Sequence, residues 1–451
     1  MRKNEFEGDY VMKNKYDYPK ASGGGHLVYL LNEFAKLKSE YRAKPEEIAA
    51  IINETDTFLN AQLEKMTALP VCKELEAKEP DDLNEIKKLR LPGERKLWTH
   101  FDAATYADRL KGALFGRMAG CTLGAIVELW SIGEMEQWAK YIGDEFPNTR
   151  YWSKAKNPNA LRYDFNTCDE YTEAGMNGVP VDDDIIYTLL GLLIAEDHGL
   201  NFNTEHVGKS WLKYLPYACT AEEIALANLK KGISAAECGE TNNPYVQWIG
   251  ADIRSDPFGY LAPGLPEKAA EMAYYDAYIS HRRNGIYGEM FFSAAIAAAF
   301  ATGDPFEALN VALREIPKES LLYNDIMWAL EIDAKTLRDY RHARELVDER
   351  FTSMNHVHTN NNAALTVFGL RLGEGNFTKA INNTVAMGLD NDCTAATVGS
   401  LFGASYGFDA IDPVWYEKFN NKIHSYLINK SEFAIDDVLY RFTKLAEKNF
   451  K

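Results

Sequence analysis

Apolar positions recur every three or four residues along most of this chain, the spacing that gathers side chains on one face of a helix. In the N-terminal part, Leu27, Leu30, Leu31, Phe34 and Leu37 follow this spacing. The alternation of apolar and polar residues that is typical of strands is scarce. The pattern therefore predicts an all-α protein.

Breaks in this pattern divide the chain into three parts. Residues 1–25 are polar and end in a run of three glycines, which is typical of a flexible N-terminal tail. Residues 26–98 form a predicted helical N-terminal extension, in which Pro45 suits the first turn of the second helix. After a break at 91–93, residues 99–451 are predicted to form a single large helical domain.

Two segments of this domain carry glycine at every fourth position, which keeps the glycines on one helical face. They are Gly112, Gly116, Gly120 and Gly124 in 108–128, and Gly399, Gly403 and Gly407 in 392–407. Each glycine inside a helix costs about 1 kcal/mol relative to alanine, so we expect neighbouring backbones to approach closely there. The alternative, a membrane dimerisation motif, does not fit the charged residues of the first segment, which are Arg109, Lys111, Arg117 and Glu128.

The composition limits the classes of function. The 451 residues are 46% apolar and 12% aromatic, enough for a large buried core, and the formal net charge of −17 repels nucleic-acid backbones. The six cysteines form no C-x-x-C pair, so we expect reduced thiols. No secretory signal follows the N-terminal basic residues, and we expect no apolar run long enough to span a bilayer. The sequence thus predicts a cytoplasmic protein that contacts neither nucleic acid nor membrane.

Acidic residues gather at the start of two predicted helices. Asp182, Asp183 and Asp184 precede a strongly apolar run, and Asp390 and Asp392 precede the second glycine-rich segment. One Asp is enough to cap a helix, and adjacent carboxylates repel each other. The number of acids at each start therefore exceeds what capping requires.

Each cluster alone has an ordinary explanation, a solvated acidic turn for the first and an Asx-turn with a helix cap for the second. Acids that lead into buried helices need a partner, and no Lys or Arg stands beside either cluster in the sequence. A shared site for divalent cations, with two ions, explains both clusters. It requires Asp183 and Asp392 to converge on one pocket.

Together these segments resemble the ADP-ribosylglycohydrolase family, which includes the enzyme that reactivates dinitrogenase reductase and the J1 crystallins. Residues 109–128 are similar to the family's opening helix, which carries regular glycines and ends in Val-Glu. Residues 182–185 match its T-D-D-T motif, and residues 388–393 match its G-G-D-T-D-T motif. The resemblance covers the chain from about residue 104 to residue 410.

The resemblance implies a function and a set of site residues. The function is metal-dependent hydrolysis at the ribose anomeric carbon of an ADP-ribosyl or related ribosyl substrate, either a small molecule or linked to protein. Two Mg²⁺ ions are expected, with Mn²⁺ as the alternative. The expected metal ligands are Asp182, Asp183, Asp184, Asp390, Asp392 and Cys393. Glu128 or Asp183 is expected to transfer protons during catalysis.

The middle of the chain supplies the expected substrate-binding residues. Gly250, Asp252 and Arg254 lie where the family has a substrate-holding N-G-x-x-M-R loop. His281 corresponds to a substrate-facing histidine at the end of a family helix. Arg254 suits a phosphate through bidentate geometry, with an internal ion pair as the alternative. For His281 the alternative is a structural hydrogen bond to backbone.

Four positions depart from the family's motifs. Asp182 and Ile185 stand where the first motif has Thr, Cys393 replaces the last Thr, and Cys121 replaces an Asp of the opening helix. The loss of Thr hydroxyls leaves open a non-catalytic protein of the J1-crystallin kind. A magnesium-dependent prenyl-diphosphate enzyme is a weaker alternative, because its acidic helix needs a further Asp where Tyr187 stands.

Overall fold

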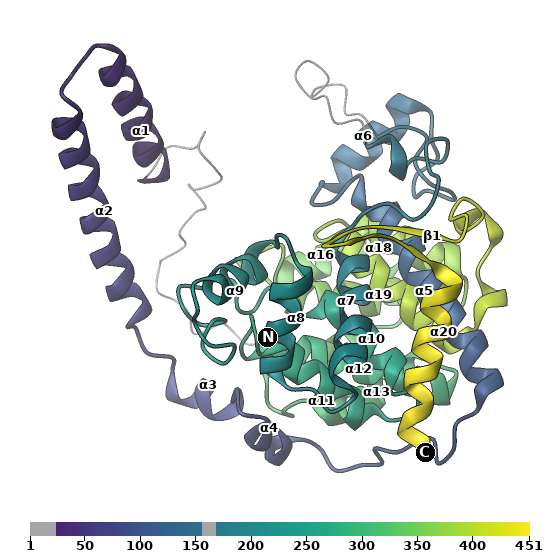
Figure 1. The fold of residues 1–451 in the computed structure, drawn as a ribbon. Coiled ribbons are helices and arrows are strands. Elements are labelled where there is room, and N and C mark those ends of the chain that lie inside the picture. The colour runs from purple at the N-terminus through teal and green to yellow at the C-terminus, as the bar shows by residue number, and fades with distance from the viewer. Residues whose placement is uncertain (1–23, 156–167) are drawn as a thin grey trace. The chain divides into compact units, whose positions relative to one another are not determined.

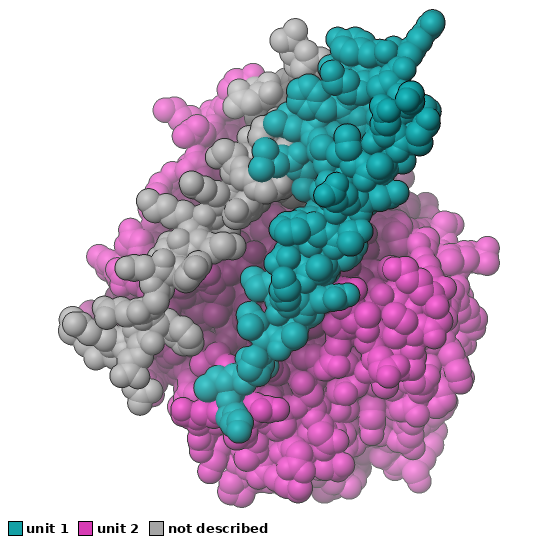
Figure 2. Space-filling model, turned by 90° about the vertical axis from the view of Figure 1, so that its left-hand side faces the viewer, with its two compact units in different colours: residues 1–73 teal, residues 74–451 magenta. Residues whose placement is uncertain are grey.

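The computed structural model describes residues 24–155 and 168–451 (Figure 1). They belong to two compact units, residues 1–73 and residues 74–451, which Figure 2 shows in separate colours. The predicted flexible tail, 1–25, lies outside the described residues except for its last two positions.

The first unit contains α1 (Gly24–Glu40) and α2 (Pro45–Thr67). Pro45 occupies the first turn of α2, as predicted. No side chain in the described part of this unit is buried, and large apolar residues such as Phe34 and Phe58 are more than half exposed. The amphipathic spacing therefore predicts the helices correctly, although the described residues of this unit form no buried core.

From Lys73 onward the chain is mainly helical. The helices are α3 (Lys73–Lys78), α4 (Leu83–Leu89), α5 (Ala103–Ala125), α6 (Ile132–Ile142), α7 (Asp183–His198), α8 (Thr204–Tyr214), α9 (Thr220–Lys230), α10 (Asp256–Leu261), α11 (Pro266–Ala277), α12 (Asn284–Thr302), α13 (Pro305–Ala312), α14 (Leu321–Glu331), α15 (Ala334–Leu337), α16 (Tyr340–Arg350), α17 (Thr359–Gly373), α18 (Phe377–Met387), α19 (Asn391–Tyr406) and α20 (Ile435–Ala446). Among the described residues, strands form only one antiparallel hairpin, β1 (Lys422–Leu427) with β2 (Lys430–Ala434). The predicted all-α class is confirmed.

The second unit begins earlier than the predicted domain start at residue 99. Glu79 is buried, forms an ion pair with Arg283 and accepts hydrogen bonds from Nδ2 of Asn284 (3.0 Å) and the backbone N–H of Leu321 (2.7 Å). Tyr287 donates to the carbonyl of Pro80 at 2.5 Å. These contacts fix the segment before residue 99 to the start of α12, so its polar residues complete the larger unit.

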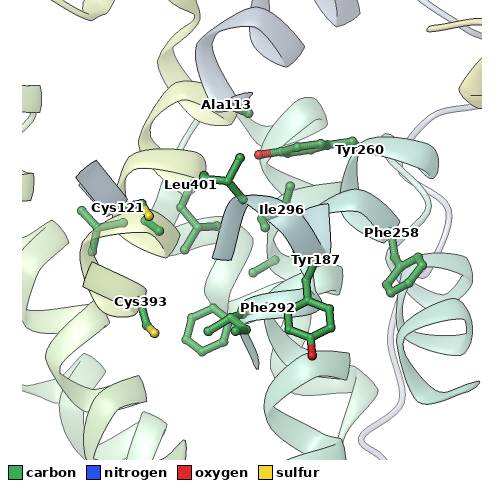
Figure 3. Close-up of a cluster of buried hydrophobic side chains, with 14 of the residues drawn as sticks. Ala113, Cys121, Tyr187, Phe258, Tyr260, Phe292, Ile296, Cys393 and Leu401 are labelled. Carbon is green, nitrogen blue, oxygen red and sulfur yellow. The ribbon is translucent and has the colours of Figure 1, made fainter. Parts of the chain in front are cut away.

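Helix α12 lies in the core of this unit. Every residue from Asn284 to Phe300 is buried, which explains its nearly uniform apolar composition. By length and mean hydropathy (1.3) α12 would suffice to cross a membrane, contrary to our expectation of no such segment, but 89% of it is buried inside the unit. Figure 3 shows the apolar cluster where α5, α7, α10, α12 and α19 meet.

Candidate metal centre

Helices α5 and α19 pack backbone against backbone along their glycine faces. A Cβ atom added to Gly116 would lie 2.1 Å from the carbonyl oxygen of Gly399, and one added to Gly124 would lie 2.4 Å from the Cα of Asp392. The predicted close approach is confirmed, and the two glycine-bearing helices face each other. Because they run antiparallel, the C-terminal end of α5 lies beside the acidic first turn of α19.

Helix α7 begins in the first of the two acidic clusters, which is formed by Asp182, Asp183 and Asp184. The carboxylate of Asp182 caps the helix by accepting a hydrogen bond from the backbone N–H of Asp184 at 3.0 Å. Asp183 and Asp184 occupy the first turn, where the unpaired N–H groups and the helix dipole favour negative charge. Local sequence thus explains why this helix starts here, with Asp184 fully buried.

Arg117 of α5 links the acidic helix to the core. It donates from Nη2 to the carboxylate of Asp184 (3.0 Å), from Nη1 to Asp256 (2.7 Å) and from Nε to the hydroxyl of Thr188 (2.7 Å). The expectation that neither acidic cluster has a cationic partner is therefore wrong for Asp184. Arg117 stands 67 residues earlier in the chain, so inspection of the neighbouring sequence missed it.

Acidic and cysteine side chains from α5, α7, α19 and the turns beside them form three overlapping groups. In each group the potential ligand atoms lie within 4.8 Å of one another: Cys121, Asp182 and Asp184; Asp184, Asp392 and Cys393; and Glu128, Asp390 and Asp392. Asp184 and Asp392 each belong to two groups. Of the residues predicted as metal ligands, only Asp183 is in none of them.

The starts of α7 and α19 open onto one cavity of about 420 Å³. Its acidic lining consists of Glu128, Asp182, Asp183, Glu222, Asp390 and Asp392. The remaining walls are Leu129, Val181, Tyr187, Tyr217, Cys219, Thr220, Trp248, Ile249, Gly250, Ile253, Val357, Cys393 and Tyr426. Asp183 and Asp392 therefore converge on one pocket, as a shared site requires, and none of these lining residues is a Lys, Arg or His.

Several carboxylate oxygens of this cluster have no partner among the described residues. Oδ2 of Asp184, Oδ1 of Asp390 and Oδ1 of Asp392 are buried and accept no hydrogen bond. Burial raises the pKa of Asp392, with repulsion from Glu128 as the next cause, and it raises the pKa of Asp184 to about 7 despite Arg117. Buried oxygens without donors are costly, and divalent cations would satisfy them. The residues present thus fit a metal centre.

Glu128 follows the end of α5 and is exposed at the cavity. Desolvation of its carboxyl group raises the pKa to about 8, and repulsion from Asp390 and Asp183 adds to the shift. Without a cation nearby, this carboxyl group is therefore mostly protonated at neutral pH. It can hold a proton at the mouth of the site.

Arg254 lies behind the cavity wall. It donates from Nε to the Asp276 carboxylate (2.5 Å), from Nη1 to Glu222 (2.6 Å) and the Gly250 carbonyl (3.2 Å), and from Nη2 to the Asp276 carbonyl (3.1 Å) and Glu289 (3.4 Å). These bonds engage all five N–H groups of the guanidinium. No donor is left for a substrate phosphate, so the structure favours the ion-pair alternative for Arg254.

The other predicted substrate-binding residues differ in their access to the cavity. Gly250 lines it, whereas Asp252 and His281 are buried and are not among its lining residues. Nδ1 of His281 lies 2.8 Å from the hydroxyl of Ser280, and burial lowers the pKa of the ring, which favours the neutral form. A substrate contact by Asp252 or His281 stays a prediction, because neither residue lines the cavity in this structure.

Sequence inspection missed a second wall of the cavity. Tyr217, next to α9, and Tyr426 of β1 line it and face each other with ring centroids 4.5 Å apart. Glu222 of α9 also lines it, and burial raises its pKa to about 7 against the attraction of Arg254. These residues come from segments far apart in the chain and form no motif, so no sequence signal could select them.

Fold and site together define an all-α protein with a carboxylate-rich candidate metal centre at two helix N-termini. The family model described as ADP-ribosylglycohydrolase matches residues 102–447. The chain belongs to the ADP-ribosylglycohydrolase family, which confirms the resemblance and supports a glycohydrolase function. The prenyl-diphosphate alternative thereby loses its basis.

Comparisons with individual proteins add little detail. No curated protein matched the chain. A solved structure named "ADP-ribosylglycohydrolase-related protein complex" is 17% identical, and the alignment covers 77% of this chain and 100% of that one, with a TM-score of 0.48.

Proposed function

We propose that this protein is a metal-dependent glycoside hydrolase that cleaves the bond at the ribose anomeric carbon of ADP-ribosyl or related ribosyl substrates. The observation that carries the proposal is the set of buried, unpartnered oxygens of Asp184, Asp390 and Asp392 beside one cavity, in a member of this family. Mg²⁺ or Mn²⁺ and a cytoplasmic location belong to the same proposal.

The three ligand groups are the candidate positions for the cations. Asp184 and Asp392 would each contact two positions, since each belongs to two groups. When bound, a divalent cation supplies Lewis-acid chemistry at the sugar hydroxyls and lowers the pKa of water. The apolar and aromatic walls of the cavity exclude bulk water and contact the rest of the substrate.

Asp183 is the carboxylate best placed to move protons. It lines the cavity but belongs to none of the ligand groups, so metal binding leaves it free. Glycoside hydrolysis needs one group to protonate the leaving group and one to accept a proton from water. Glu128, whose raised pKa keeps it protonated before the cation binds, is the second candidate.

The test compares the full-length protein with Asp392→Asn, Asp183→Asn and the matched control Asp304→Asn. Asp304 caps α13 through its carboxylate and lies outside the cavity, and Asn caps helices equally well. Each protein is incubated with ADP-ribosylated peptides and with ribonucleosides, with and without Mg²⁺ or Mn²⁺. Calorimetry measures cation affinity in parallel.

We expect the wild type and Asp304→Asn to release ribose or ADP-ribose only when the cation is present. Asp392→Asn should lose both cation affinity and turnover. Asp183→Asn should bind the cation normally but lose turnover by about 10²–10⁴-fold, the usual contribution of general acid–base catalysis. Full activity of Asp392→Asn would refute the metal centre, and a wild type that binds no cation would favour the non-catalytic alternative.

A further inference from the structure

We infer that the metal centre is asymmetric, with an inner position for a thiophilic cation of the Zn²⁺ class and an outer position for a hard cation such as Mg²⁺. The inner position is the group of Asp184, Asp392 and Cys393. The outer position combines Asp392 with Glu128 and Asp390. The inference rests on the proposed metal dependence and assigns a different ligand chemistry to each position.

The inner position combines a sulfur donor with two carboxylates that each have an unpartnered oxygen. Sγ of Cys393 and carboxylate oxygens of Asp184 and Asp392 all lie within 4.8 Å of one another, and all three side chains are buried. Oδ2 of Asp184 and Oδ1 of Asp392 have no hydrogen-bond partner among the described residues. Since Zn²⁺ binds sulfur at about 2.3 Å and carboxylate oxygen at about 2.0–2.2 Å, small shifts would bring these atoms onto one ion.

The Cys393 side chain is directed at the acidic cluster rather than at the apolar core alone. Its thiol lies within 4.8 Å of carboxylate oxygens of Asp184 and Asp392, and Cys393 is one of the residues that line the cavity. Figure 3 shows its sulfur at the edge of the buried cluster, on α19. A bound cation would take the place of the thiol proton in these contacts.

Donor chemistry separates the two positions. Thiolate sulfur is a soft ligand that selects Zn²⁺ and similar ions, whereas Mg²⁺ prefers oxygen ligands throughout. The outer group offers only carboxylate oxygens, from Glu128, Asp390 and Asp392. Because Asp392 belongs to both groups, it can bridge the two ions.

Depth also separates the two positions. Glu128, in the outer group, is an exposed residue, whereas all three members of the inner group are buried. We therefore expect the outer cation to exchange quickly with solvent and the inner cation to survive dialysis that removes the outer one.

Two other cysteines near the centre supply controls. Cys219 lines the same cavity and is exposed, but it belongs to none of the ligand groups. Cys121 belongs to the group with Asp182 and Asp184, but unlike Cys393 it does not line the cavity. We therefore assign the sulfur ligand to Cys393 alone.

The experiment titrates the reduced full-length protein with Cd²⁺, which reports thiolate ligation by an ultraviolet sulfur-to-metal charge-transfer band. Wild type should develop the band with one equivalent of Cd²⁺, and about 1,000-fold excess Mg²⁺ should not remove it. Cys393→Ser should lose the band and bind Zn²⁺ at least about 10-fold more weakly. A loss of about 10-fold is the smallest that is usual even when the changed residue only hydrogen-bonds to a metal ligand. Cys219→Ser, Cys121→Ser and Glu128→Gln should keep the band.

A second variant guards against simple misfolding of Cys393→Ser. Cys393→Asp restores an anionic oxygen donor, so it should bind cations without the band and retain a native circular-dichroism spectrum. Cd²⁺ binding to wild type without the band, a band that persists in Cys393→Ser, or its loss in Cys219→Ser would overturn the inference.

The outcomes also distinguish this inference from the proposed function. Metal-dependent hydrolysis without a charge-transfer band refutes only the asymmetric centre. A normal band in a cation-loaded protein that releases no product from any substrate refutes the hydrolase and leaves the metal centre in place.

Discussion

A single methyl group added at Gly120 should separate the two helices that position the metal centre. The new Cβ in Gly120→Ala would lie 2.0 Å from the carbonyl oxygen of Ala395, whereas ordinary contacts begin near 3.4 Å. The obstacle is backbone rather than a flexible side chain, so no rotamer change relieves it. The helices α5 and α19 must therefore move apart locally by about 1.4 Å, the difference between the two distances.

The expected effect on stability follows from two opposing contributions. Alanine gains about 1 kcal/mol over glycine in helix propensity, while overpacking of a filled core costs about 1–3 kcal/mol and sometimes more. We expect net destabilisation of up to about 2 kcal/mol. The effect on the site should be larger, since Ala395 lies three residues after Asp392 and metal ligands tolerate displacements of only about 0.2 Å.

The assay measures thermal unfolding and cation affinity for Gly120→Ala beside Gly133→Ala. Gly133 lies in α6, where an added Cβ meets no atom within 4 Å, so this control should gain up to about 1 kcal/mol. Gly120→Ala should melt at lower temperature than wild type and bind the cation at least about 10-fold more weakly. If it matches wild type in both measurements, the close packing does not position the ligands.

Three further predictions concern the charges of the site. Asp392→Asn should raise the melting temperature measured in chelator, because it removes repulsion among buried carboxylates. It should also abolish the further rise in melting temperature that a divalent cation causes in the wild type. A variant that melts at a lower temperature than the wild type in chelator would contradict this prediction. The metal-free protein should resist urea better as the pH falls from about 8 to 6. Folding raises the pKa of Asp184 from 3.8 to about 7, so the folded state binds the proton at a higher pH than the unfolded state. Each pH unit below 7 therefore adds about 1.4 kcal/mol to the free energy of unfolding, until the unfolded pKa is reached. A urea midpoint that drops over that window would be inconsistent with the raised pKa. Arg117→Met should lower the free energy of unfolding by about 3–5 kcal/mol, because Asp184 and Asp256 stay buried without the guanidinium group that pairs with them. The control Arg441→Met, which removes a partly exposed ion pair, should lower it by less than about 1 kcal/mol. Equal losses in the two variants would contradict this prediction.

Local spacing is why most of the fold could be predicted. The segments 108–128 and 392–407 correspond to α5 and α19, with ends displaced by a few residues. The regular glycines also indicated close backbone contact. The sequence did not indicate that the two glycine faces pack against each other, because a glycine face allows close approach by the backbone of any helix.

Long-range contacts account for what sequence reasoning missed. The partners of Glu79 lie more than 200 residues later, so the segment before residue 99 looked like an extension rather than part of the larger unit. Arg254 has the residue type expected of a phosphate ligand, but three carboxylates from α9, α11 and α12 already surround it. Charge partners depend on the fold and leave no trace in local spacing.

Repulsion within the acidic cluster is too large for the protein to absorb unaided. Two like charges 4.8 Å apart repel by about 3.5 kcal/mol at an effective dielectric constant of 20. Three ionised carboxylates at Glu128, Asp390 and Asp392 contain three such pairs, about 10 kcal/mol, which approaches the whole stability of a typical domain. The helix N-termini of α7 and α19 return only about 0.3–2 kcal/mol each.

The metal-free cluster must therefore retain protons at neutral pH, in agreement with the raised pKa values of Glu128 and Asp184. Cation binding then has to displace those protons, because metal ligands must be ionised. Adding Mg²⁺ or Zn²⁺ to weakly buffered protein at pH 7 should release about one proton or more per molecule, measured with an indicator dye, and Asp392→Asn should release fewer. If saturation with the cation released no proton, the carboxylates would already be ionised in the metal-free protein. The folded state would then contain a carboxylate repulsion comparable to the free energy of unfolding of a typical domain, which would contradict the inferred retention of protons.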